Sequence, residues 1–255
     1  MKPNAILLKL LAAAAIAAAP AARAAVVSQV VFSDHTYADA NWTIVNQFGL
    51  VSAGQVATGG NPGSYRQVAL GVGQNAPFVG QLNNTFVYNP TAQGAITGIT
   101  YNMDLETLNA AGAGYFALLS QNGNFYIDNV HGGNAGANTW LNQNIVLNLS
   151  DFALLTVTAG VDVFVIDRTK LPDFSATGAP ITFGYEVAAG GAGFFTSITG
   201  IDNDPIILTV TPPVTSGVPE LSTWAMMIAG FMLVGVRLRR QAEAGRKRPA
   251  INSAA

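Results

Sequence analysis

The chain contains no cysteine. Disulfide bridges, thiol catalysis and cysteine-ligated zinc sites are therefore excluded, and the fold has to be held by its core. Histidine is nearly as scarce, with two residues in 255. Neither His35 nor His131 belongs to a recognisable nucleophile motif, and the neighbouring side chains of Ser33-Asp34-His35 would point apart on a strand, so they do not form a hydrolytic triad.

Basic residues are rare in the middle of the chain. Between residues 25 and 217 only Arg66, Arg168 and Lys170 are basic, against twelve acidic residues, so this segment has a net charge of −9. The formal net charge of the whole chain is only −2, because nine of its 12 basic residues lie near the two ends. An acidic surface disfavours nucleic acid and anionic lipid, but it tolerates divalent cations and neutral sugars.

A long amphipathic helical pattern is missing between residues 25 and 217. Short apolar runs are instead separated by turn signals such as Gly59-Gly60-Asn61-Pro62-Gly63. Over residues 97–106 and 181–187 apolar side chains recur at every second position, which places Thr182 and Glu186 on the outward face of the second run. About ten or more such strands in one domain predict an all-β fold, an antiparallel β-sandwich of the jelly-roll type.

An uncharged run lies near the C-terminus, from residue 221 to residue 236. Its length of about 16 residues is slightly below the ~20 that span a hydrocarbon core, but flanking arginines can snorkel. Because an excess of Lys and Arg marks the cytoplasmic flank, we expect a transmembrane helix over residues 221–238 and a basic cytoplasmic tail over residues 241–255. On these physical grounds alone, an ordinary C-terminal membrane anchor accounts for the segment equally well.

The order of features in this segment resembles the PEP-CTERM sorting signal, in its PExxWA-type variant. The residues that carry the resemblance are Val218, Pro219, Glu220, Trp224, Ala225, Arg237, Arg239 and Arg240. Leu221 stands where the family has a second proline. The resemblance implies an exosortase partner, a membrane cysteine protease of Gram-negative bacteria that make exopolysaccharide. It also implies cleavage near Pro219-Glu220, with transfer of the preceding domain from the inner membrane to the cell surface or the medium.

The N-terminus is consistent with export. A basic start, an apolar stretch over residues 10–19 and the sequence Ala22-Arg23-Ala24 predict a secretory signal peptide that is cleaved after Ala24. Such a signal implies the Sec translocon as a partner. The predicted organisation is a signal peptide at 1–24, a β-sandwich ectodomain at 25–210, a linker at 211–217 and the sorting signal at 218–240.

The ectodomain resembles jelly-roll modules related to carbohydrate-binding and laminin-type domains. Phe32-Ser33-Asp34 with Trp42 is similar to their opening strand, and Gly200-Ile201-Asp202-Asn203 is similar to the turn before their closing strand. In such modules the first and last strands lie side by side, and a structural calcium ion often bridges them. The resemblance implies a calcium site whose carboxylate ligands are Asp34, Asp39, Asp202 and Asp204. These residues are equally suited to capping turns.

Exposed aromatic rings are a second kind of candidate site. A Trp or Tyr ring can stack on a pyranose while Asn and Asp side chains bind its hydroxyls. Trp42 and Trp140 are the leading candidates, followed by Tyr65 and Tyr126. Trp140 follows a Gly/Asn-rich stretch, which predicts a loop. Each of these rings can instead fill the core.

Two carboxylates offer an enzymatic alternative. Asp104 and Glu106 lie two residues apart, so on a strand they share a face with Cα atoms roughly 6.5–7 Å apart, and paired carboxylates are the groups that glycosidases use. The pair is solitary, which favours solvated charges on an outer face. We therefore expect a non-enzymatic exported protein, structural or glycan-associated in exopolysaccharide or biofilm. Two alternatives stay open: a secreted polysaccharide-active hydrolase that uses Asp104 and Glu106, and a self-associating envelope protein whose edge strands pair without a ligand.

Overall fold

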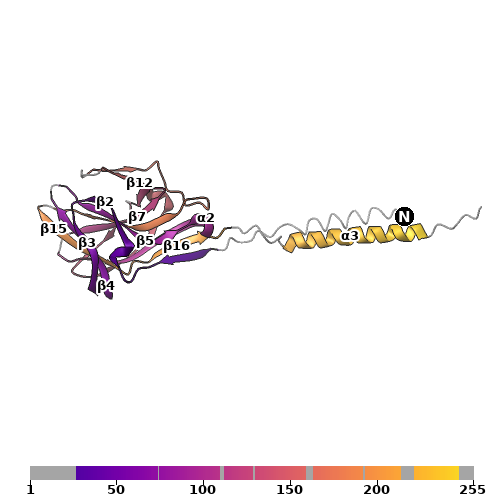
Figure 1. Ribbon diagram of the computed structural model, residues 1–255, viewed down its shortest axis with the longest axis horizontal. Coiled ribbons are helices and arrows are strands. Elements are labelled where there is room, and N and C mark those ends of the chain that lie inside the picture. Colours follow the sequence, from indigo (N-terminus) through magenta and orange to yellow (C-terminus); the bar gives the residue numbers. More distant parts are fainter. Residues whose placement is uncertain are drawn as a thin grey trace, which may run out of the picture. The chain divides into compact units, whose positions relative to one another are not determined.

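A computed structural model describes residues 27–73, 75–109, 112–128, 130–158, 163–191, 193–213 and 221–246. One compact unit spans Ala25–Pro213. Within its described residues, strands form two sheets that pack face to face (Figure 1), and the strand pairs are antiparallel except for the short parallel pairing of Gly136–Ala137 with residues 106–107. The predicted all-β antiparallel sandwich is confirmed.

Sheet A is built around one long strand, β6. Its strands, in order of pairing, are β1 (Ser28–Phe32), β16 (Ile206–Thr211), β6 (Ala95–Thr107), β15 (Phe195–Asp202), β4 (Gly63–Val72) and β3 (Leu50–Gly60), with β10 (Gly136–Ala137) and β11 (Leu141–Leu147) also paired to β6. Leu105 of β6 pairs with Ile201 of β15 and with Leu141 of β11. Strand β6 therefore pairs with neighbouring strands along both of its edges.

Sheet B contains the remaining strands. In order they are β13 (Phe164–Asp167), β12 (Phe152–Val157), β8 (Asn124–Asp128), β7 (Ala113–Gln121), β14 (Ile181–Ala189), β5 (Phe78–Tyr88) and β2 (Trp42–Phe48), with β9 (Gly133–Asn134) paired to β7. Short helical turns connect some strands: η1 (Asp39–Asn41), α2 (Pro90–Gln93) and η2 (Leu149–Asp151). Asn89 caps α2, because its side chain accepts a hydrogen bond from the Thr91 N–H.

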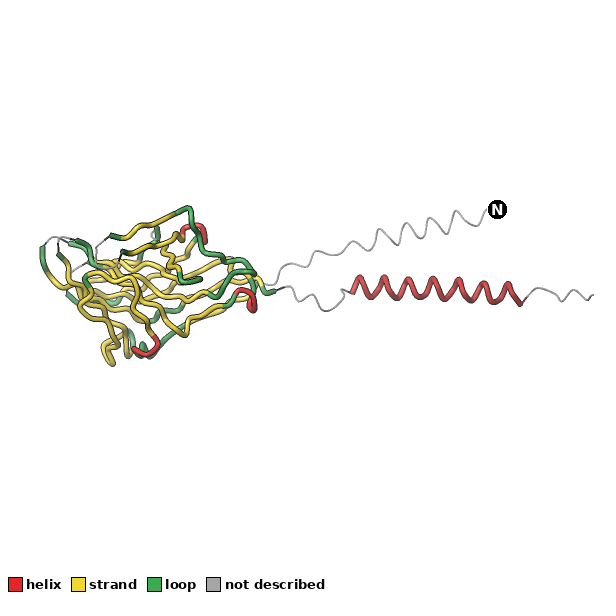
Figure 2. The backbone as a smooth tube through the Cα atoms, turned by 45° about the horizontal axis from the view of Figure 1, so that its top comes forward, coloured by secondary structure: helices red, strands yellow, loops and turns green. Residues whose placement is uncertain are grey.

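The first and last strands of the sandwich pair with each other. Ser28 lies opposite Val210 and Phe32 lies opposite Ile206, in an antiparallel register without a bulge. Two segments at opposite ends of the domain sequence thus lie side by side. Figure 2, coloured by secondary structure, shows that strands make up most of the sandwich. The resemblance to jelly-roll modules implied this pairing.

The alternating patterns of the sequence correctly identify the inward-facing residues. In β6 the side chains of Ile99, Tyr101, Met103 and Leu105 are all at most 4% exposed, and in β14 those of Ile181, Phe183, Tyr185 and Val187 are at most 2% exposed. These side chains form the main core between the sheets. Burial of such large apolar side chains is the dominant stabilising contribution to a sandwich of this kind.

The outward face of sheet B differs from the prediction. Glu186 points away from the main core as expected, but it is only 4% exposed. A second apolar cluster covers this face, formed by Leu82, Leu118, Ile127 and Leu155. Sheet B is therefore apolar on both faces, whereas an ordinary antiparallel sheet has one solvated face.

The C-terminal helix α3 (Leu221–Arg246) covers the predicted transmembrane segment. Within the described residues, no helix combines the length and the hydropathy that crossing a membrane requires. The transmembrane helix predicted over residues 221–238 is therefore not confirmed. The signal peptide, most of the linker, Val218, Pro219 and Glu220 lie outside the described residues.

Candidate functional site

Trp42 belongs to the core rather than to the surface. It is 7% exposed, and its ring packs against Tyr37, Phe86 and Tyr185. The guanidinium of the buried Arg66 lies 5.1 Å from the centre of the Trp42 ring, a cation–π geometry. Trp42 therefore offers no exposed ring face to a ligand.

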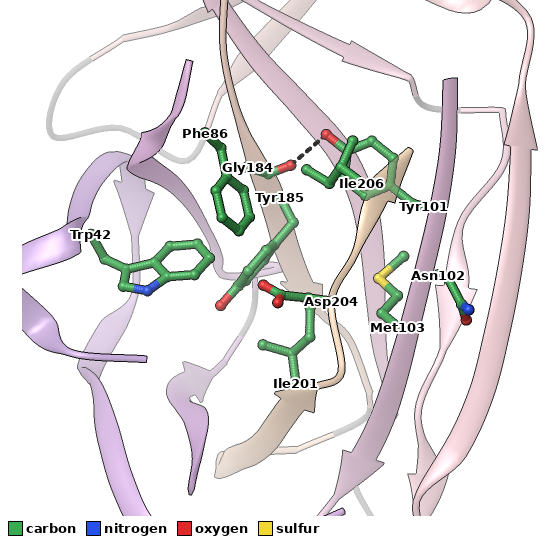
Figure 3. A pocket seen from close by; sticks show the side chains of 10 residues that line it. All are labelled: Trp42, Phe86, Tyr101, Asn102, Met103, Gly184, Tyr185, Ile201, Asp204 and Ile206. Carbon is green, nitrogen blue, oxygen red and sulfur yellow. Dashed lines mark hydrogen bonds between the residues drawn. The ribbon is translucent and has the colours of Figure 1, made fainter. Parts of the chain in front are cut away.

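A small cavity lies beside Trp42, between the two sheets. Figure 3 shows the residues that line it, which come from both sheets and include Tyr101, Tyr185 and Asp204. The Tyr101 hydroxyl donates a hydrogen bond to the carbonyl oxygen of Gly184 over 2.9 Å. The cavity volume is about 10 Å³, which is the size of about one water molecule. It is too small for a sugar ring.

The first two of the four aspartates predicted to bind calcium, Asp34 and Asp39, contact residues near them in the fold. Asp34 accepts hydrogen bonds from the Thr36 and Tyr37 backbone N–H groups, each over 2.9 Å, and from the Trp42 indole over 3.1 Å. Burial by itself would raise the pKa of Asp34, but these hydrogen bonds outweigh burial and leave the pKa below its ordinary value. Asp39 is 69% exposed and forms a 3.0 Å ion pair with Arg66.

The other two aspartates lie where β15 turns into β16. Asp202 accepts hydrogen bonds from the backbone N–H of Asn203, over 2.7 Å, and from that of Asn61. Asp204 is buried, which raises its pKa well above the ordinary value, and its Oδ1 accepts a 3.2 Å hydrogen bond from the Tyr37 hydroxyl. All four residues thus bind turns or side chains, and the calcium site stays a prediction.

The described residues offer one other arrangement with metal-ligating atoms, formed by Asp128, His131 and Asp151. His131 Nδ1 lies 3.1 Å from Asp128 Oδ2 and 3.6 Å from Asp151 Oδ2. The carboxylates already have partners, however: Asp128 Oδ1 accepts from the Val130 N–H, and Asp151 Oδ2 accepts from Asn148. A histidine that bridges two turn-forming aspartates accounts for the geometry without a metal.

Trp140 lies on the outer face of sheet A and is half-buried. Its ring meets the ring of Tyr65 edge to face, with centroids 5.3 Å apart, and its indole N–H donates to the carbonyl oxygen of Gly59 over 3.2 Å. Both rings lie directly over Gly200 of β15, where an added Cβ would be 2.9 Å from each ring. A residue with a side chain at this position would push the two rings off the sheet. We call Trp140 and Tyr65 the ring pair.

Polar side chains flank the ring pair on the neighbouring strands. In the sheet register Glu106 of β6 and Gln67 of β4 lie opposite Gly200, one on each side. Gln67 Nε2 donates to the Tyr65 hydroxyl over 3.2 Å. Burial raises the pKa of Tyr65, and the nearby charge of Glu106 raises it further. Burial also raises the pKa of Glu106 itself. An aromatic surface with hydrogen-bonding groups on both sides suits a ligand that has an apolar ring face and polar edges.

Asp104 occupies the next outward position of β6, and it is 5% exposed rather than solvated. Its carboxylate accepts hydrogen bonds from three amide groups: Asn142 over 2.8 Å, Asn203 over 2.7 Å and Asn61 over 3.2 Å. These bonds tie the β3–β4 hairpin to the β15–β16 turn beside the ring pair. Amides thus bind both carboxylate oxygens of Asp104, and a catalytic role of Asp104 with Glu106 stays a prediction.

Comparison with known proteins gives no family assignment. No family model matches the chain, and no curated protein matches it. The chain is similar to a family 11 carbohydrate-binding module from Clostridium thermocellum in complex with a β-1,3-1,4-mixed-linked tetrasaccharide, with 15% identity, coverage of 71% of this chain and 94% of that chain, and a TM-score of 0.41. It is also similar to a mannan-recognising carbohydrate-binding module, with 11% identity, coverage of 71% and 98%, and a TM-score of 0.39. An exo-β-agarase gives 14% identity, coverage of 72% and 26%, and a TM-score of 0.40. Similarities this weak transfer neither a site nor a ligand to this chain.

Proposed function

We propose that the sandwich is a non-catalytic glycan-binding module, and that it binds a neutral polysaccharide on the outer face of sheet A. The ring pair is the observation that carries this proposal. Trp140 presents an indole ring that is held in place by Tyr65 and by its hydrogen bond to Gly59. A ring fixed in this way loses little conformational entropy when a sugar stacks on it.

The charge of the domain and the surrounding side chains support a neutral sugar. The segment from residue 25 to residue 217 has a net charge of −9, which would repel polyanionic glycans. Glu106 and Gln67 lie where they can hydrogen-bond hydroxyl groups at the two edges of a stacked sugar. The amide network around Asp104 holds the neighbouring turns in place, so the binding surface is formed before the ligand arrives.

The test is affinity electrophoresis of the full-length chain in gels that contain galactomannan, mixed-linkage β-glucan, xylan or alginate. We expect at least one neutral polysaccharide to retard the wild type, and alginate not to retard it. Trp140→Ala should weaken binding about 10- to 100-fold, which is the usual cost of removing a central aromatic contact. Phe194→Ala is the matched control, because Phe194 is an aromatic residue that is 81% exposed and lies outside the ring pair. Equal retardation of Trp140→Ala and wild type would disprove the site.

We also propose that residues 218–240 direct export and exosortase processing. The support is the order Pro219, Glu220, Trp224, uncharged run and arginine cluster in the sequence. Intact-mass measurement on fractions of the native host tests this proposal. A surface or secreted form that ends near Val218 is expected, and a mature protein that retains Arg237–Arg240 in the inner membrane would overturn it.

A further inference from the structure

The outer face of sheet B contains a groove of about 270 Å³. Its walls are almost entirely apolar, with the phenyl rings of Phe78, Phe116 and Phe164 among them. The edge strand β13 closes the groove on one side, since the ring of Phe164 meets the ring of Phe78 edge to face at 5.4 Å. This groove lies on the opposite sheet from the ring pair, so it is a separate feature of the molecule.

One polar group, Glu186, interrupts the apolar lining. It is 4% exposed, and within the described residues its Oε2 atom is fully enclosed without a hydrogen-bond partner. A buried polar atom without a partner destabilises the fold, and a leucine at the same place would carry no such cost. Within the described residues this atom has no partner, and the other residues that line the groove offer no polar side chain.

The neighbouring strand makes room for this carboxyl group. Gly80 of β5 lies opposite Glu186 of β14 in the sheet register. A Cβ at Gly80 would lie 2.6 Å from Glu186 Oε2, 2.8 Å from Leu118 Cδ2 and 2.9 Å from Val45 Cγ2. The absence of a side chain at residue 80 therefore creates the recess that the carboxyl group occupies.

The protonation state of Glu186 decides which ligand chemistry fits. Burial raises the pKa of Glu186 well above its ordinary value of 4.5. Apolar surroundings thus favour the neutral form of the carboxyl group, and a neutral carboxylic acid can donate a hydrogen bond. The matching group on a ligand is an oxygen that accepts this bond.

We propose that this groove binds a small apolar molecule with one hydrogen-bond-accepting oxygen, such as an aryl or alkyl ketone, and that Glu186 donates a hydrogen bond to that oxygen. The volume supports a small molecule rather than a protein, because a stable protein interface buries on the order of 1,200–2,000 Å² of surface. The almost wholly apolar lining supports it over a sugar, whose hydroxyl groups would lack partners there.

The test uses two probes of nearly equal shape, acetophenone and ethylbenzene, of which only the first has a carbonyl oxygen. Binding to the full-length chain is titrated by ligand-observed NMR. Both probes are expected to bind the wild type saturably. Glu186→Leu should weaken acetophenone about tenfold, the upper part of the range for a lost hydrogen bond, and should leave ethylbenzene unchanged or tighter.

Three further variants make the outcome decisive. Glu186→Gln retains a neutral N–H donor of the same size, so it should retain acetophenone binding. Ala188→Phe places a ring in the groove and should remove both probes, whereas Trp140→Ala should affect neither. Glu186→Leu replaces an unpaired polar group with an apolar one, so it is expected to fold.

Two results would overturn the proposal. One is acetophenone affinity that is the same in Glu186→Leu and wild type, or absent from the wild type altogether. The other is a dimer of the wild-type chain, detected by sedimentation, that dissociates in Ala188→Phe, because the occupant of the groove would then be a second copy.

Discussion

The outer faces of sheet A and sheet B are built on the same alternation of side chains, but they differ in what covers them. On sheet A the outward positions of β6 include the polar residues Asn102, Asp104 and Glu106. On sheet B the outward positions include Leu82, Leu118 and Ile127, which are at most 6% exposed. Alternation thus identifies the residues that face the main core, and the composition of the other face decides whether that face is solvated or forms a second apolar surface.

Leu118→Ala has the largest expected effect, because it removes an apolar side chain from the outer face of sheet B. Leu118 is fully buried on the outer face of sheet B, so its truncation should lower the free energy of unfolding by about 3 kcal/mol. Asn144→Ala on the outer face of sheet A, where Asn144 is exposed, is the matched control and should stay within about 0.5 kcal/mol. Urea unfolding of both variants measures the difference. Similar costs for the two would mean that both outer faces are solvated.

The pH dependence of stability should also reflect the burial of Glu186 on the outer face of sheet B. Below the ordinary pKa of 4.5, Glu186 is protonated in both the folded and the unfolded states. The stability that its neutral form contributes to the fold is therefore fully present at such pH values. As pH rises toward the raised pKa of the folded state, only the unfolded state ionises, and stability falls by up to about 1.4 kcal/mol per pH unit.

Glu186→Gln should remove this part of the slope. Asp204 also has a raised pKa and contributes a slope of the same sign, but that slope remains in the variant. The difference between the two stability curves, measured by urea unfolding from pH 4 to pH 8, therefore isolates Glu186. Parallel curves would show that its carboxyl is solvated.

Gly200→Ala tests sheet A, with a smaller expected effect on stability. The added Cβ would lie 2.9 Å from Trp140 Cη2 and from Tyr65 Cδ2, so the half-buried Trp140 ring has to shift outward at a cost of about 1 kcal/mol. In affinity electrophoresis, the polysaccharide that retards the wild type should no longer retard Gly200→Ala, because the geometry of the ring pair is lost. Gly98→Ala is the control on β6, because the nearest atom to its Cβ would be Thr209 Cβ at 3.4 Å. If Gly200→Ala binds as wild type does, the ring pair is not the binding surface.

Much of the fold could be predicted from the sequence, because local patterns determine it. The alternation in residues 97–106 and 181–187 correctly indicated the inward faces of β6 and β14, and the turn at residues 59–63 separates β3 from β4 as predicted. The second apolar face also had a sequence signal. Residues 115–119 are apolar at every position, which is typical of a strand buried on both sides.

The ring pair could be predicted only in part. Trp140 and Tyr65 are both candidates from the sequence, but their contact over Gly200 joins residues from separate parts of the chain. Those residues meet because β4 and β6 both pair with β15, and strand order is not encoded in any local pattern. Trp42 shows the converse, since its neighbours in sequence could not reveal that Arg66 and Tyr185 would enclose it.

The pairing of β1 with β16 has a practical consequence for rearranging the chain. Ser28 lies opposite Val210, so a linker of a few residues could join the two ends of the sandwich. The chain could then be opened at Gly123, where the hairpin between β7 and β8 turns through a positive φ of 74° and an added Cβ would meet no other atom within 4 Å. Such a circular permutant would keep both outer faces intact. Comparing its folding with that of the original chain would show whether the order of the strands in the sequence affects the order in which they fold.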